Sequence, residues 1–371
     1  MAKLGDICEI LDSKRVPITS SNRKAGIYPY YGANGVQDYV NDYIFDDELV
    51  LLAEDGGHFG STDKPIAYRV SGKCWVNNHA HVLKPKEGLN VDYLCYSLKF
   101  RNVSNIVNGA TRQKLTQADM REIDIPLLSL KEQDTIVERL NKIFDLISLR
   151  KQQLSKLDEL VKSRFIEMFG TLSSNEQNFE VLTIESLCSL IKDGTHQTPT
   201  YTEDTINGFK FLSSKDVMST KIDWSDIKYI PSDLHEKLYA VVKPIKNDIL
   251  MSKNGVNYGV AAVNDTDEVF DIYVSLALLR PKTDIINPVY FRSAINSPDT
   301  KRQFDSSIKG IGVPNLHLGE IKKTKILVPP VDKQNEYVSF VEQTDKSKLA
   351  IQQSLEKLET LKKALMQQYF G

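Results

Sequence analysis

Two stretches of the chain, residues 131–168 and 332–369, carry apolar side chains at alternating steps of three and four positions. Strong helix formers dominate both stretches, and the first contains no proline or glycine. This heptad spacing predicts two long helices, each with a narrow apolar stripe. A helix of about 38 residues is about 57 Å long, well beyond an ordinary domain helix. We therefore expect a coiled coil, the alternative being amphipathic helices that lie on a globular core.

The two helices belong to a long internal repeat. Asn108–Gln133 aligns without gaps with Lys309–Gln334, and the same offset continues to the Phe-Gly pairs at 169–170 and 370–371. Because a repeat of this kind implies a pseudo-two-fold axis, we expect the helices to pack antiparallel. The residues expected in their shared interface are Ile143, Ile147, Leu154, Leu157, Val161, Ile351, Leu355, Leu358 and Leu365.

Upstream of each helix the chain carries short strand-like runs, broken by Gly, Pro, Asn and Asp. Short helices are expected among them at Val91–Lys99 and Pro288–Ile295, so each globular segment is predicted to be mixed α/β (α+β). The two halves match loosely here, which indicates a shared scaffold with variable loops. The predicted organisation is a domain at 1–130, a helix at 131–170, a polar linker at 171–182, a domain at 183–331 and a helix at 332–371.

Composition narrows the functional classes. The 371 residues include 47 Lys and Arg against 49 Asp and Glu, so any nucleic-acid binding must come from local patches. No apolar stretch reaches the roughly 18–20 residues of a membrane helix, and no signal peptide is visible. The four cysteines form no C-x-x-C pair or zinc pattern, which favours reduced thiols in a cytoplasmic protein.

One fragment, Asn287-Pro288-Val289-Tyr290, is similar to the Asn/Asp-Pro-Pro-Tyr loop of adenine amino-methyltransferases. The first half has Asn90 and Tyr93 at the matching positions, so the spacing of Asn and Tyr is repeated. Asn287 followed by Pro288 also fits the cap and first turn of a helix. Since no glycine-rich loop after a strand offers a cofactor site, we do not expect a methyltransferase.

A second fragment combines Asp299, Glu320 and Lys322, the residue types of magnesium-dependent nuclease centres. The first half has no counterpart of Asp299, and an acidic residue near a basic one before a strand is common by chance. No Walker A pattern occurs, and the histidines form no metal triad. A stand-alone nuclease therefore remains the alternative function, while the leading interpretation has no catalytic residue and no metal ligand in this chain.

Loops of both globular segments carry the side chains that contact bases and phosphates, at corresponding positions of the two halves. Such loops are usually solvated surface, but their recurrence in a duplicated domain favours DNA binding. The candidates in the first half are Lys14, Arg15, Arg23, Lys24, His58, Lys64, Arg112, Gln113 and Lys114. Those in the second are Lys192, Thr195, His196, Gln197, Thr198, Tyr201, Lys215, Lys253, Asn254, Asn257, Tyr258, Lys309 and Asn315.

The chain resembles the specificity (S) subunit of type I restriction–modification systems over essentially its whole length. The segments that carry the resemblance are DGTHQTPTY at 193–201, CWVNNHAHVLKP at 74–85, IDIPLLSLKEQ at 123–133 and GVPNLHLGEIKKTKILVPPVDKQ at 312–334. One departure is Leu127–Leu130, which lacks the second proline that Pro329-Pro330 keeps in the other half. This departure puts only the local loop shape in doubt.

The resemblance implies a non-catalytic subunit of a DNA methyltransferase and endonuclease complex. It implies that each globular domain is a target-recognition domain for one half of a split double-stranded DNA target. It also implies that the helices set the spacer and dock two modification subunits, which are joined by two restriction subunits. S-adenosylmethionine, ATP and magnesium would then belong to those partners. Two divergent domains predict an asymmetric target, and two helices of equal length predict a fixed spacer.

Overall fold

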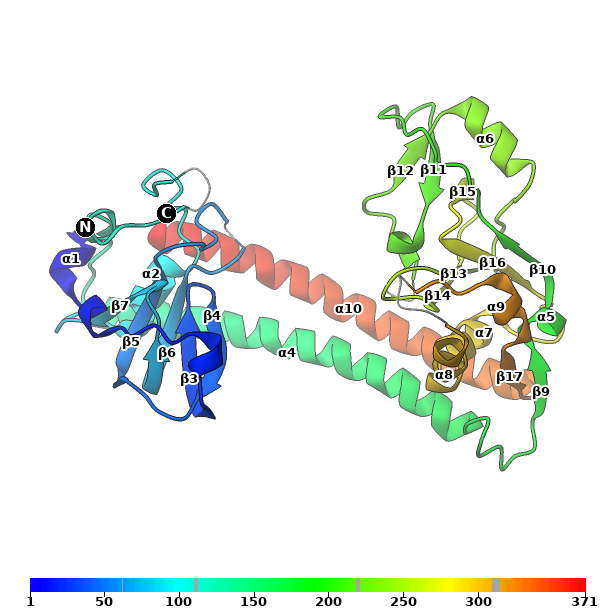
Figure 1. Cartoon of the computed structure of the whole chain (residues 1–371), viewed down its shortest axis with the longest axis horizontal. Coiled ribbons are helices and arrows are strands. Elements are labelled where there is room, and N and C mark those ends of the chain that lie inside the picture. The colour runs from blue at the N-terminus through cyan, green and yellow to red at the C-terminus, as the bar shows by residue number, and fades with distance from the viewer. Residues whose placement is uncertain (62, 110–112, 218–220, 309–313) are drawn as a thin grey trace. The chain divides into compact units, whose positions relative to one another are not determined.

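The computed structural model describes residues 1–61, 63–109, 113–217, 221–308 and 314–371. Arg112 and Lys309, both predicted to bind DNA, lie outside the described residues. The chain divides into two compact units, residues 1–152 with 352–371 and residues 153–351. Each unit holds one globular domain together with parts of both long helices (Figure 1). Among the described residues, no helix combines the length and the apolarity needed to cross a bilayer.

The first unit is built on a six-stranded sheet of order β2-β7-β5-β6-β3-β4, beside a small β1-β8 ladder. Its elements are β1 (Ala2–Lys3), α1 (Leu4–Ile7), β2 (Cys8–Ile10), the 3₁₀ turns η1 (Asp12–Lys14) and η2 (Ser20–Asn22), β3 (Ala25–Gly32), β4 (Gly35–Val40), β5 (Phe45–Ala53), β6 (Ala67–Val76), β7 (Ala80–Pro85), α2 (Val91–Lys99), α3 (Gln117–Arg121), β8 (Asp124–Ile125) and the first part of α4 (Leu130–Phe169).

The second unit contains a four-stranded sheet, β10-β16-β13-β14, a three-stranded sheet, β12-β11-β15, and a β17-β9 ladder. Its elements are β9 (Glu180–Thr183), α5 (Ile184–Leu187), β10 (Cys188–Asp193), β11 (Phe209–Leu212), η3 (Ser214–Val217), β12 (Lys228–Ile230), α6 (Ser232–Tyr239), β13 (Ile249–Ser252), β14 (Ala261–Val263), β15 (Phe270–Ile272), β16 (Leu276–Pro281), α7 (Pro288–Ile295), α8 (Pro298–Ser307), α9 (Leu318–Lys323), β17 (Lys325–Val328) and the first part of α10 (Val331–Phe370). The first residues of β9 fall in the stretch predicted as linker.

The two domains share one strand order. In the first, β5 pairs antiparallel with β6 and β7, and β7 pairs with β2. In the second, β13 pairs antiparallel with β14 and β16, and β16 pairs with β10. The predicted mixed α/β class and its duplication are therefore confirmed.

The central strand of each sheet is apolar on both faces because both faces are covered. Val50 and Leu52 of β5 pack toward α2, whereas Leu49 and Leu51 join a second cluster on the opposite face. In the second domain Ile249 of β13 faces α7, and its neighbours along the strand alternate in the same way. This burial fixes the carboxyl end of each central strand, where the loops of the candidate site begin.

The domains differ in the strand that follows the central one in the sheet order. In the first, β6 is one ten-residue strand that pairs with β5 along most of its length and parallel with β3 at Trp75 and Val76. In the second, two short strands, β14 and β15, take these two roles, because the intervening loop separates the sheets.

Helices α4 and α10 are each 40 residues long and pack antiparallel within both units. In the first unit, Arg139 of α4 donates to the hydroxyl of Tyr369 at 3.2 Å, and Lys151 further along α4 pairs with Glu359 at 3.2 Å. In the second, Asp158 pairs with Lys348 at 2.6 Å, and Arg164 with Glu336 at 3.6 Å. As residue numbers rise along one helix, those of its partner fall, as the repeat predicted.

The predicted interface residues of the helices are buried or half-buried. Ile143, Ile147 and Leu355 are buried. The half-buried members are Leu154, Leu157, Val161, Ile351, Leu358 and Leu365. Leu365 packs against the apolar cluster of the first domain and Val161 against that of the second, and a shared helix interface stays a prediction for these nine residues.

A buried glutamine joins each long helix to the domain before it. In the first unit, Gln133 accepts from the backbone N–H of Asn90 at 2.8 Å and donates to the carbonyl oxygens of Gly88 and Leu128. Both this residue and Gln334, its counterpart, are 0% exposed.

The second unit repeats this arrangement. Gln334 accepts from the backbone N–H of Asn287 at 2.8 Å and donates to the carbonyl oxygens of Ile285 and Pro329. Asn287 caps α7 by accepting from the backbone N–H of Val289. The repeated Asn of the two halves is thus a helix cap, which explains the similarity to a methyltransferase motif.

The repeated tyrosines also have structural roles. Tyr93 and Tyr290 donate to backbone carbonyl oxygens, each at 2.8 Å. The ring of Tyr93 lies 5.2 Å from that of Phe370, and the ring of Tyr290 lies 4.9 Å from that of Phe169. The repeated phenylalanine near the end of each helix therefore packs on the domain of the same unit.

Candidate nucleic-acid interface

In both domains the loop after the central strand is hydrogen-bonded to a loop much later in the chain, the one before α3 in the first domain and the one before α9 in the second. In the first, the backbone N–H of Leu115 donates to the carbonyl of Glu54 at 2.7 Å, and Gly56 donates to Gln113 at 3.2 Å. The second domain has the same two bonds, from Leu316 to Lys253 at 2.9 Å and from Gly255 to Pro314 at 3.1 Å. The structure thus brings together, in each domain, two loops predicted to bind DNA.

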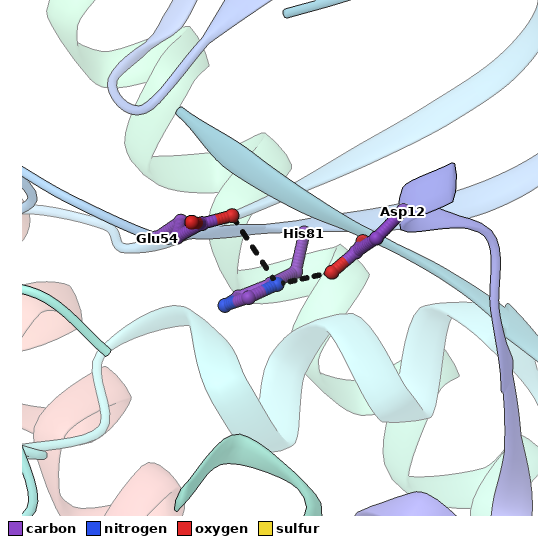
Figure 2. A group of neighbouring side chains, drawn as sticks. All are labelled: Asp12, Glu54 and His81. Carbon is purple, nitrogen blue, oxygen red and sulfur yellow. Dashed lines mark hydrogen bonds and ion pairs between the residues drawn. The ribbon is translucent and has the colours of Figure 1, made fainter. Parts of the chain in front are cut away.

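A buried charged cluster lies at the base of these loops in the first domain (Figure 2). Nδ1 of His81 lies 2.6 Å from a carboxylate oxygen of Asp12 and 3.6 Å from one of Glu54. His81 extends from β7, Asp12 begins η1, and Glu54 follows β5. Asp12 also accepts from the backbone N–H of Val82 and from the side chain of Gln117.

Two cations neutralise the carboxylates of this cluster. Arg15 approaches Glu54 at 2.5 Å and Asp12 at 3.5 Å, and Lys114 approaches Glu54 at 2.9 Å. Within the described part of the chain, Asp12, Glu54 and His81 form the one group of three or more possible metal ligands. Because Arg15 and Lys114 already bind the carboxylate oxygens, we assign the cluster to charge pairing.

The cluster lowers the pKa values of both carboxyl groups. Burial alone raises the pKa of Asp12, but hydrogen bonds and charge from His81, with the bonds from Val82 and Gln117, outweigh it. Burial likewise raises the pKa of Glu54, and the bonds from Arg15 and Lys114 more than reverse this effect. Both groups are therefore held as carboxylates.

The other predicted residues of the first domain divide into half-buried residues with internal partners and exposed residues. Arg23 is structural: its guanidinium lies 4.2 Å from the ring centroid of Tyr30, donates to the carbonyl of Ile18 and pairs with Asp38. Arg15 donates hydrogen bonds to the carboxylate of Glu54 and to the carbonyl oxygen of Ala80. The exposed candidates are Lys14, Lys24, Lys64, Gln113 and Lys114, and His58 is half-buried.

At the end of its central strand the second domain has a positively charged residue, where the first domain has the negatively charged Glu54. Lys253, which aligns with Glu54, is 5% exposed and forms an ion pair with Asp193. His196 lies 3.7 Å from the same carboxylate with its side chain 77% exposed. The side-chain oxygen of Asn254 is buried, with no hydrogen-bond partner among the described residues. Lys253 is therefore structural, while His196 is free to contact a ligand.

Some of the remaining candidates of the second domain have internal partners, and others are exposed. Lys215 binds Asp216 and Asp226, at 3.2 and 2.9 Å. The hydroxyl of Tyr258 donates to Asp305 and accepts from Lys301. Thr195 is half-buried, and the exposed candidates are Lys192, Gln197, Thr198, Tyr201, Asn257 and Asn315.

The nuclease candidates serve as local structural contacts. Asp299 accepts from the backbone N–H of Leu172 at 2.6 Å and pairs with Arg302. Glu320 pairs with Lys323 at 3.5 Å, and Lys322 pairs with Glu185 at 3.1 Å. Each of the three residues thus has a separate partner.

Four residues of the site were not predicted from the sequence: Asp12, Glu54, His81 and Asp193. A signal was available in the repeat, since LVLLAEDG at 49–56 and DILMSKNG at 248–255 align with Glu54 opposite Lys253. A residue whose charge changes sign between the two copies, at the end of the same buried strand, must have an ion-pair partner of opposite sign in each domain.

The duplicated scaffold, the charged loops and the long helix pair define a two-domain DNA-specificity protein, and comparisons with known proteins agree. The family model of the type I restriction modification DNA specificity domain matches residues 1–159 and again residues 176–362. The chain belongs to this family.

Similar proteins extend over nearly the whole chain. A putative type I restriction enzyme specificity subunit of Haemophilus influenzae is 28% identical, over 98% of this chain and 94% of its own length. The MjaVIII specificity subunit of Methanocaldococcus jannaschii is 21% identical, over 99% and 90%. Among solved structures, the S subunit of M. genitalium matches with a TM-score of 0.57 at 14% identity, over 100% of this chain and 95% of that chain. This last likeness concerns the fold alone.

Proposed function

We propose that this chain is the DNA-specificity subunit of a type I restriction–modification complex. Each domain reads one half of an asymmetric, bipartite double-stranded target, and the two helices set the spacer between the halves. The observation that carries the proposal is the retention of one scaffold in both domains together with opposite charge and different side chains at the matching loops. A duplicated reader with two loop chemistries fits a target with two different halves.

The catalytic steps belong to partners in this proposal. Two modification subunits dock on the helices, bind S-adenosylmethionine and methylate adenine, and two restriction subunits add ATP- and magnesium-dependent cleavage. This chain itself contributes no catalytic residue and binds no cofactor, in keeping with the separate structural contacts of Asp299, Glu320 and Lys322. The complex acts in the cytoplasm, where its DNA substrate lies.

Assembly with the modification subunits of the same system tests this function. We expect methylation of adenines within one split sequence when this chain is present, and none when it is omitted. The variants Asp299→Asn and Glu320→Gln are expected to retain this activity. Magnesium-dependent DNA cleavage by the purified chain alone, abolished by Glu320→Gln, would instead establish the nuclease alternative.

A further inference from the structure

Val256 is an apolar residue in the middle of the loop that joins β13 to β14 (Figure 1), and it is 85% exposed. Single exposed apolar residues are common on protein surfaces, so exposure alone assigns no role to this side chain. Two further features of Val256 do carry an assignment: the fixed backbone of its loop and the exposed hydrogen-bonding side chains that lie next to it.

The loop is held at both ends by backbone hydrogen bonds. The carbonyl of Ser252, which is 0% exposed, accepts from the N–H of Gly259 at 2.7 Å, and the N–H of Gly255 donates to the carbonyl of Pro314 at 3.1 Å. Gly255 and Gly259 have φ angles of 84° and 85°, a conformation that glycine adopts without strain. Val256 is therefore placed by the backbone around it and not by contacts of its own side chain.

Hydrogen-bonding residues predicted to contact DNA lie beside this loop. Asn257 follows Val256 directly and is exposed. Asn315, also exposed, lies on the segment that forms a β-bridge with Asn254. The side chain of His196, 77% exposed, lies beside the ion pair at the base of the loop. A DNA duplex that contacts Asn257 and Asn315 is therefore within reach of Val256.

A valine side chain can recognise one feature of the base edges. It has no polar atom, so it cannot bind the donors and acceptors of the grooves, but it can pack on the C5 methyl group that thymine presents in the major groove. Because a β-branched side chain is stiff at χ1, little side-chain entropy is lost in such a contact. Side chains that wedge between base steps are instead longer or cyclic, such as Phe, Leu, Met and Pro.

We propose that Val256 is a specificity-determining residue whose side chain packs on the C5 methyl group of a thymine in the half-site read by the second domain. The inference rests on the proposed function and adds one base preference to it. The neighbouring polar side chains supply hydrogen bonds to the duplex. Val256 supplies an apolar contact that cytosine, which has no methyl group at C5, does not offer.

The matching loop of the first domain has no room for such a side chain. Gly57 aligns with Val256, because each directly follows the aligned glycine whose N–H binds the neighbouring loop. A Cβ atom at Gly57 would lie 2.6 Å from the Cβ of Ala53 and 3.1 Å from the ring of Phe59. A side chain at this position would therefore collide with its own domain, so we expect the methyl contact in one half-site alone.

The test measures DNA binding by the full chain assembled with its modification subunits. Replacement of the loop Lys192–Tyr201 identifies the half-site of the second domain, and each thymine of that half-site is then replaced in turn by 2′-deoxyuridine, which lacks only the methyl group. We expect one replacement to weaken binding about fourfold, the effect of removing one methyl group from an apolar contact.

The variant Val256→Ala should bind the thymine duplex and this deoxyuridine duplex equally, because the partner of the methyl group is gone. The variant should fold normally, since an exposed side chain contributes little to packing. Val269→Ala, the same change at an exposed valine directly before β15, is the matched control and should keep the fourfold difference. Deoxyuridine in the other half-site should affect the wild type and Val256→Ala alike.

Two results would overturn the proposal. The first is a half-site without any position that is sensitive to the methyl group. The second is a methyl dependence that persists in Val256→Ala, or a loss of affinity in this variant that is equal for the wild-type target and every deoxyuridine duplex, as a wedge or a phosphate contact would give. Absence of discrimination at both half-sites by the wild-type assembly would instead refute the proposed function.

Discussion

Glu54 and Lys253 show how two residues at one position of the repeat can have opposite charge and a similar structural role. Each lies at the end of the central strand of its sheet, and each has a half-buried partner of opposite charge. Both Lys253 and Arg15 were predicted to contact DNA, because they are basic and lie in loops. A sequence shows the charge of a side chain but not its partner, so these two structural roles could not be predicted.

Replacement of Lys253 tests this assignment. Lys253→Met leaves the carboxylate of Asp193 without its buried partner, and the expected loss of unfolding free energy is about 3–5 kcal/mol. Thermal or denaturant unfolding of the full chain measures the change. Lys64→Met, at an exposed lysine of the first domain, is the matched control and should leave stability nearly unchanged. Unaltered stability in Lys253→Met, with weaker DNA binding, would return Lys253 to the DNA contacts.

The lowered pKa values of Asp12 and Glu54 predict sensitivity to acid. Both carboxyl groups are more acidic in the folded chain than when unfolded. Their contribution to stability is therefore present above about pH 4, the ordinary carboxyl range, and is lost as pH falls through the folded pKa values. Glu54→Gln should be less stable than the wild type at pH 7, and melting temperatures should converge toward pH 3. A gap that stays constant with pH would contradict this explanation.

At the scale of elements, the long helices were predicted closely, whereas their contacts with the domains were not. Heptad spacing identifies a helix and its stripe without tertiary information. Phe165 and Phe169 are buried because their rings meet Tyr290 of α7 in the second domain and Tyr337 of the partner helix α10. Heptad spacing contains no information about a contact with the domain, so the packing of Phe165 and Phe169 on Tyr290 was not predicted.

The buried glutamines give a prediction for the junction of helix and domain. Gln334→Leu removes three hydrogen bonds and leaves the N–H of Asn287 and two carbonyl groups without partners. At about 1–3 kcal/mol for each unsatisfied group, we expect a loss of at least about 3 kcal/mol in unfolding free energy. Gln343→Leu, at an exposed position of the same helix, is the control. Equal stability of the two variants would show that the glutamine does not fix the junction.

At the scale of the whole molecule, the repeat predicted one fold present twice, and the shared strand order confirms it. The separate three-stranded sheet of the second domain could not be predicted, because the offset between the halves drifts where β14 and β15 replace β6. The DNA-contact residues remain predictions. Exposed members such as Gln113 and His196 keep that role, while Arg23 and Lys253 are explained by internal contacts.

The central claim is that each domain reads its own half of the target. Its most direct measurement is a map of methylated adenines produced by the assembled complex, before and after replacement of the loop Lys192–Tyr201. We predict that the half-site read by the second domain changes or is lost, while the other half and the spacer stay the same. Changes in both halves, or an unchanged target in a folded and assembled variant, would contradict the claim.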